Sequence, residues 1–149
     1  MKPRLSNHPS RPNLGPAKIK HLSLQVVGAA IAVHGKLGPG LLESVYETHL
    51  IKELRRMGLV VKVQLPTTAA LKKQGGTTNG LRLGLLVAET IIVDLQSVAT
   101  VQLARKQRLM TCLRLAGKPL GLLINFNVTQ LKDGIEQIVN IPDLLFYYE

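Results

Sequence analysis

The sequence predicts an α/β fold in which helices flank a small mixed sheet. Apolar residues recur every three or four positions in several long segments, which is typical of amphipathic helices. Between these segments lie short apolar runs of strand length, rich in Val, Ile and Leu. Two of these runs are joined by residues 88–90 alone, a connection that only an antiparallel hairpin can make. Because the chain has 149 residues, we expect one domain with a single core.

Two helices are predicted at the start of the chain. Residues 19–34 carry apolar side chains at helical spacing, and the sequence Leu-Gly-Pro-Gly at 37–40 predicts a turn after them. The second helix runs from about Leu41 to Met57, with its apolar residues again three and four apart. Gly58 follows this helix and suits a left-handed cap at its C-terminal end.

Three strands are predicted next. After the second helix the apolar period changes to two, so Val61 and Val63 should share the buried face of a half-buried strand. Residues 72–80, rich in Gly, Thr and Lys, are expected to form a loop. The apolar runs at 81–87 and 91–95 then form the hairpin.

The last third predicts a helix, a strand and a second helix. The first of these helices spans about Leu103 to Ala116, and Gly117 ends it. Leu120 to Phe126 is a continuous apolar run, which favours a strand buried on both faces. A short final helix is predicted from about Thr129 to Val139, because its apolar residues are three and four apart.

Composition divides the chain into three parts. Residues 1–20 contain four prolines among Ser, Asn and basic side chains, and this composition favours a flexible basic arm. Residues 21–140 are expected to form the folded domain, and residues 141–149 a C-terminal tail.

The chain has a formal net charge of +10, and this charge is unevenly distributed. No acid precedes Glu43, and none lies between Asp94 and Asp133. The second acid-free stretch includes the basic residues of the predicted helix at 103–116: Arg105, Lys106, Arg108 and Arg114. Such a field favours polyanions, so we expect these four residues to bind the backbone of DNA or RNA. A solvated basic face without a partner is the alternative.

Three further details narrow the class of protein. Only 3% of the residues are aromatic, which argues against stacking on bases and favours contacts with the backbone. The single cysteine, Cys112, excludes an intramolecular disulfide and agrees with a reducing compartment, so we expect a cytoplasmic location. The longest apolar run, near residues 24–33, is too short to cross a bilayer, so no membrane partner is expected.

One motif lies where the second predicted helix begins. Gly40, Glu43 and Tyr46 form the pattern G-x-x-E-x-x-Y, and the segments GLRLGLLV, IIVDLQSV and LGLLINF follow it in that order. In these features the chain resembles the GxxExxY proteins, a branch of the PD-(D/E)XK nuclease-like superfamily, over about residues 20–140. The resemblance implies a nuclease-like core with the element order α-β-β-β-α-β.

The resemblance also implies a site. In active members of the superfamily, a helix Glu, an Asp on the second strand and Glu-x-Lys on the third converge on a divalent ion that activates water. Here Glu43 and Asp94 stand at the two Glu positions, whereas Gly84 and Gln96 replace the expected Asp and Lys. We therefore expect a degenerate catalytic site at these four residues and the loss of ordinary hydrolysis. No cofactor is expected, or only Mg²⁺ held weakly by Glu43 and Asp94.

Asp94 requires compensation, because burying a lone carboxylate is costly. It either faces an open cleft or pairs with a base such as Arg82 or Arg108. Arg108, where the family often carries Gln, could place its guanidinium in the former metal site. Lys106 could instead replace the lost Lys, but it would not restore the acid missing at Gly84.

Other motif residues have structural interpretations. Glu43 in the first turn of a helix stabilises the helix dipole, and Tyr46 is interpreted mainly as a core residue. Cys112, between Leu109 and Leu113, is interpreted as a buried apolar residue.

Three functions follow from these observations. The first is a catalytically degraded nuclease-like protein that acts by binding, with nucleic acid as the expected partner. The second is an active Mg²⁺-dependent nuclease with an unconventional site. The third is a protein-interaction or oligomerisation module whose basic surface is incidental.

Overall fold

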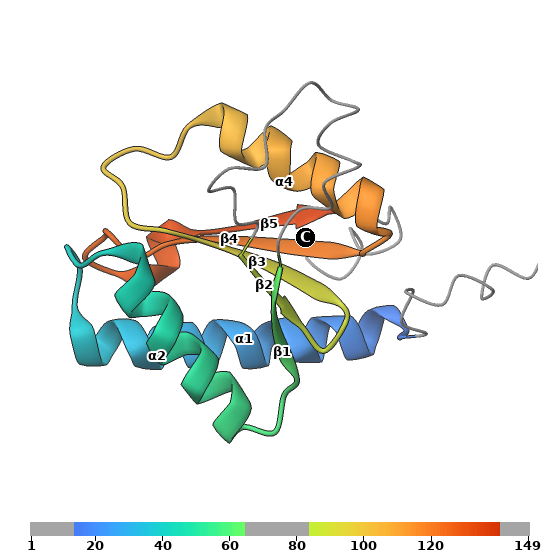
Figure 1. Ribbon diagram of the computed structural model, residues 1–149, viewed down its shortest axis with the longest axis horizontal. Helices are drawn as coiled ribbons and strands as arrows, with labels where there is room; N and C mark the ends of the chain where they lie inside the picture. Colours follow the sequence, from blue (N-terminus) through green and yellow to red (C-terminus); the bar gives the residue numbers. More distant parts are fainter. Residues whose placement is uncertain (1–13, 65–83, 141–149) are drawn as a thin grey trace, which may run out of the picture.

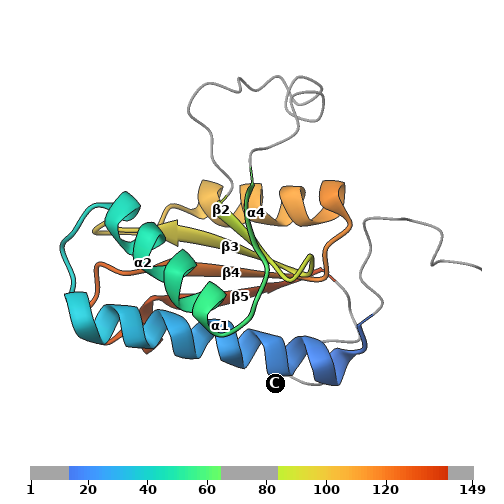
Figure 2. The ribbon, with the colours of Figure 1, turned by 60° about the horizontal axis from the view of Figure 1, so that its bottom comes forward.

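The computed structural model describes residues 14–64 and 84–140, which form three layers (Figure 1). Helices α1 and α2 cover one face of a five-stranded sheet, and α4 covers the other (Figures 1 and 2). The α/β fold with a mixed sheet flanked by helices is confirmed. Along the chain the elements are α1 (Pro16–Leu37), α2 (Glu43–Arg56), β1 (Val61–Gln64), β2 (Gly84–Val87), β3 (Ile91–Gln96), α4 (Leu103–Ala116), β4 (Leu120–Asn125), the 3-10 helix η2 (Leu131–Gly134) and β5 (Ile135–Val139).

The strands lie in the order in which they occur along the chain, β1-β2-β3-β4-β5. Three of the four pairings are antiparallel, and β3 and β4 are parallel. A parallel pair needs a long crossover, and α4 provides it. The central strands β2, β3 and β4 are buried along their whole length, because helices cover both faces of the sheet.

Helix α1 begins earlier than expected. It starts at Pro16, within the segment that composition assigned to a flexible arm. Proline suits the first turn of a helix, since its missing N–H would have no partner there. Ile19 is buried against the core, so residues 16–20 belong to the folded domain. Residues 1–13 and the predicted tail at 141–149 lie outside the described residues.

The hairpin of β2 and β3 has the predicted antiparallel pairing. Its three-residue connection, 88–90, places Ala88 and Glu89 at φ 51° and 56°, and the Thr90 N–H donates to the Val87 carbonyl at 3.0 Å. Positive φ at both central residues is what a type I′ turn requires, a conformation that usually favours glycine or asparagine. The hairpin therefore forms on a turn sequence that lacks glycine.

The prediction of a helix at 129–139 was wrong. The segment forms η2 and then β5, which pairs antiparallel with β4. Gly134 joins the two, and a Cβ there would lie 2.1 Å from the Asn125 carbonyl oxygen, so only glycine allows this close approach. Leu131 is buried on the α1 face and Ile138 on the α4 face, so their helix-like spacing serves two separate cores.

Strand β1 also departs from the prediction. Val61 is buried, but Val63 is 45% exposed, because β1 is a short strand at the edge of the sheet. The predicted loop at 72–80 and the start of the run at 81–87 lie outside the described residues. Within the described ranges, no helix is long and apolar enough to cross a membrane.

Candidate functional site

Strand β3 sends alternate side chains to the two faces of the sheet. Ile91, Val93 and Leu95 join the core beneath α1 and α2. Ile92 packs in the smaller core beneath α4, so Asp94 and Gln96 also face α4. Both polar side chains are buried at the C-terminal end of the strand.

Asp94 is compensated by Arg105 of α4. The Arg105 Nη2 atom lies 2.6 Å from Asp94 Oδ1, and Nε lies 3.4 Å from Oδ2. The Asp94 side chain is 6% exposed and the Arg105 side chain 30%, so the pair joins a buried carboxylate to a half-buried guanidinium. The expected partner Arg108 is therefore replaced by Arg105, one helical turn earlier. Arg82, the other base considered, lies outside the described residues.

A second ion pair lies two strands away from the first, on the same face of the sheet. Asp94 is in register with Leu123 of β4, and Leu123 is in register with Glu136 of β5. Lys106 reaches Glu136 at 2.9 Å. Consecutive residues of the first turn of α4 thus bind carboxylates on either side of β4. Two of the four predicted nucleic-acid-binding residues therefore have acidic partners that are distant in sequence.

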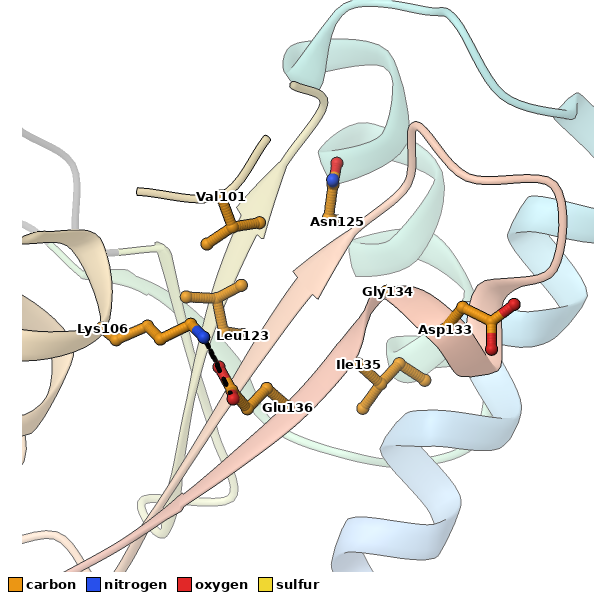
Figure 3. Close-up of a pocket in the computed structure, with 8 residues that line it drawn as sticks. All are labelled: Val101, Lys106, Leu123, Asn125, Asp133, Gly134, Ile135 and Glu136. Atoms are coloured by element: carbon orange, nitrogen blue, oxygen red, sulfur yellow. Dashed lines mark hydrogen bonds and ion pairs between the residues drawn. The ribbon is translucent and has the colours of Figure 1, made fainter. Parts of the chain in front are cut away.

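A pocket of about 230 Å³ lies beside this second pair (Figure 3). Figure 3 shows the Lys106–Glu136 pair on one side of the pocket and Asp133 on the other, with Asn125 above Leu123. Asn125 anchors the loop that follows β3, since its side chain accepts a hydrogen bond from the Val98 N–H and donates one to the Val98 carbonyl. The pocket lies near the C-terminal ends of the parallel strands β3 and β4, where α/β folds commonly bind ligands.

Gln96 and Gly84 occupy the positions of the expected Lys and Asp. Gln96 is buried, and its Nε2 atom has no hydrogen-bond partner within the described residues. Gly84 has φ 100°, and a Cβ there would lie 1.9 Å from the Val93 carbonyl oxygen. The backbone of β3 therefore fills the space in which a β2 carboxylate would begin.

Glu43 lies apart from this cluster. It is the exposed first residue of α2, as expected for a carboxylate in the first turn of a helix. Ser97, which follows β3, donates to the Leu41 carbonyl at 2.5 Å, so the start of α2 lies near the end of β3. However, α2 packs on the face opposite to that of Asp94 and Gln96.

Tyr46 has a structural role. Its side chain is fully buried, its hydroxyl donates to the Gly38 carbonyl at 2.5 Å, and it accepts from the Leu41 N–H. Its ring stacks on Phe126, with 4.5 Å between the ring centroids. The motif tyrosine thus fixes the turn between α1 and α2.

The remaining residues of α4 extend the basic surface. Arg114 is exposed and Arg108 is half-buried, and neither forms an ion pair within the residues that the structure describes. Cys112 is buried, which raises the pKa of its thiol, while the charge of Arg108 lowers it in part. This confirms that Cys112 is a buried residue.

The described residues form an α/β domain with a polar cluster at the C-terminal end of a central strand. A family model described as the PD-(D/E)XK nuclease superfamily matches residues 20–138, and the chain belongs to this superfamily. Comparisons with curated proteins and with solved structures gave no match.

The residues present do not fit the divalent ion that this superfamily implies. Both Asp94 oxygens face the Arg105 guanidinium, position 84 carries no side chain, and residue 96 offers an amide. Across the described ranges, no three His, Cys, Asp or Glu side chains come close enough to hold a metal ion.

Sequence reasoning missed Glu136 and the role of Arg105. The sequence predicted Arg105 to be a nucleic-acid contact because its stretch of the chain lacks acids. The sequence did indicate that buried Asp94 needs a base nearby. This requirement pointed to α4, but to Arg108 and not to Arg105 one turn earlier.

Proposed function

We propose that this chain is a GxxExxY-type member of the superfamily that has lost hydrolysis and binds the backbone of DNA or RNA through the face bearing α4. The observation that carries this proposal is the pairing of Asp94 with Arg105. Arg105 balances the negative charge of the Asp94 carboxylate, as a bound metal ion would otherwise do. The buried charge is therefore compensated without a cofactor.

The charge of α4 supports binding. Arg108 and Arg114 lack acidic partners among the described residues, and the Arg105 side chain is 30% exposed. Phosphate contacts of this kind depend on charge and carry little sequence information. We accordingly expect similar affinity for unrelated sequences. Because Cys112 is the single cysteine and is buried, we place this binding in the reducing cytoplasm.

A cleavage assay tests the loss of hydrolysis. The purified protein is incubated with plasmid, single-stranded DNA and RNA in the presence of Mg²⁺ or Mn²⁺. We expect no metal-dependent cleavage above the background of an Asp94→Ala preparation purified in the same way. Cleavage that Glu43→Ala and Asp94→Ala abolish would instead identify an active nuclease with an unconventional site.

A binding assay tests the partner class. Fluorescence anisotropy with a labelled mixed-sequence duplex and a matching RNA should show binding at low salt. Failure to bind either at low salt would contradict the proposal and leave an interaction or oligomerisation module as the better function.

A further inference from the structure

The Arg105 guanidinium has two donor edges, and Asp94 occupies one of them. Nε and Nη2 face the two Asp94 oxygens. The other edge consists of Nη1 and the second N–H of Nη2. Within residues 14–64 and 84–140, Nη1 forms no hydrogen bond, and the side chain is 30% exposed. An edge with two parallel donors is therefore unoccupied among these residues, on a side chain that is partly open to solvent.

Asp94 fixes the orientation of the Arg105 guanidinium. Asp94 is buried within a central strand, so its carboxylate has little freedom to move. Arg105 itself lies in the first turn of the 14-residue helix α4, which has no acid there and whose N-cap residue, Gln102, forms no side-chain cap. The positive end of the helix dipole thus acts in the same direction as the guanidinium charge.

A guanidinium held in this way matches the geometry of a phosphodiester. Two parallel N–H groups bind two phosphate oxygens at once, which a lysine ammonium cannot do. We infer that Arg105, positioned by Asp94, is the principal phosphodiester contact of this chain, and that the contact requires no metal ion. This inference rests on the proposed function and assigns its central residue.

The inference reverses the expected effect of removing Asp94. If charge alone governed binding, loss of this acid would raise the positive charge of the site and tighten binding. If Asp94 positions Arg105, its loss releases the guanidinium and weakens binding. The sign of the change therefore separates positioning from simple electrostatics.

Affinity for a labelled mixed-sequence duplex, measured by anisotropy at fixed low salt in EDTA, provides the test. We expect wild type to bind in EDTA, Arg105→Lys to bind about tenfold more weakly, and Asp94→Ala roughly threefold more weakly. The matched controls are Arg56→Lys and Glu53→Ala, which alter a pair between an exposed Arg and a half-buried Glu on α2, on the opposite face of the sheet. We expect these controls to stay within roughly twofold of wild type.

Several results would overturn the inference. These are tighter binding by Asp94→Ala, equal affinities of Arg105→Lys and Arg56→Lys, or binding that EDTA abolishes and Mg²⁺ restores. Arg105→Lys keeps a base beside Asp94, so it remains informative if circular dichroism shows that Asp94→Ala is unfolded. Absence of wild-type binding at low salt contradicts the proposed function itself, and is thereby distinguished from failure of the inference alone.

Discussion

Asp94 and Arg105 differ in how much of each side chain water reaches, and this difference determines what each substitution should cost. Arg105→Gln leaves a buried carboxylate without its base, so we expect a loss of about 3 kcal/mol in the free energy of unfolding. Asp94→Asn leaves a half-buried cation that can turn toward solvent, so we expect a loss of only about 1 kcal/mol. Urea denaturation at neutral pH measures both.

The double variant Asp94→Asn/Arg105→Gln is the control for this prediction. It should lose less stability than the sum of the two single changes, because neither charge is left alone. Additive losses would show that the pair does not couple the two residues.

Gly84 leaves no room for a carboxylate at the position where the resemblance implies one. Position 84 combines φ 100° with a Cβ position 1.9 Å from a β3 carbonyl oxygen, so any side chain forces the backbone to move. We expect Gly84→Asp to lower the free energy of unfolding by about 2–4 kcal/mol. We also expect Gly84→Asp/Gln96→Lys to show no metal-dependent cleavage.

Thermal denaturation and the plasmid assay check these expectations. Gly28→Asp is a matched control on the exposed side of α1, where a Cβ meets nothing within 4 Å. Its loss should be much smaller, and equal losses for the two variants would contradict the explanation from close approach.

The partner of Asp94 illustrates what pattern alone can predict about a site. Burial of a lone carboxylate indicated that a base must be near, and α4 supplies one. Arg105 and Arg108 are three residues apart and lie on the same side of the helix, so the pattern could not decide which of them reaches β3. The connection from Ser97 to Gln102 sets how far α4 is displaced along the sheet, and that displacement places Arg105 over Asp94.

At the scale of elements, the sequence predicted well those segments whose apolar side chains enter one core or whose strands have a short connection. The bounds of α4 and the antiparallel pairing of the β2–β3 hairpin agree with the sequence pattern, since the helix has one buried side and the hairpin a short connection. Strand β5 was mistaken for a helix because Leu131 and Ile138 point into cores on opposite faces of the sheet. Pairing with the edge of β4 makes a strand more stable than a helix in this segment. The sequence does not reveal that this edge is available.

The β2–β3 turn is held by a buried lysine, which predicts a pH effect. Lys118 donates to the Glu89 carbonyl at 2.9 Å, and burial lowers the pKa of Lys118 below its usual value of 10.5, although Glu89 raises it in part. The unfolded chain therefore binds more protons than the folded one as pH approaches 10.5, and stability should rise with pH in that window. Below it, the cost of burying the charge is fully present.

Replacing this lysine isolates the effect. The free energy of unfolding of Lys118→Met, followed by urea denaturation from neutral pH to pH 10.5, should rise less steeply than that of wild type. The other lysines are common to both proteins and cancel in the comparison. A difference that stays constant across this range would show that Lys118 does not titrate with the fold.

At the scale of the whole molecule, the distribution of charge matters more than its sum. The chain carries a formal net charge of +10, but Arg105 and Lys106 are paired with acids brought from β3 and β5. Arg108 and Arg114 carry charges without such partners among the described residues, and the sequence of residues 1–13 adds Lys2, Arg4 and Arg11 to this second group of cations. The long-range part of any attraction to nucleic acid should therefore come from this second group.

Deleting residues 1–13 tests this division. The deletion removes Lys2, Arg4 and Arg11 but leaves α1, which begins at Pro16, so the domain should keep the thermal stability of the full chain. Each phosphate contact that is lost should reduce the slope of log affinity against log salt by about 0.9. If all three cations bind phosphates, the slope should therefore fall by roughly 2–3. Anisotropy with a mixed-sequence duplex across a salt series measures both slopes. An unchanged slope would assign the binding to α4 alone, whereas a loss of thermal stability would show that residues 1–13 contribute to the folded domain.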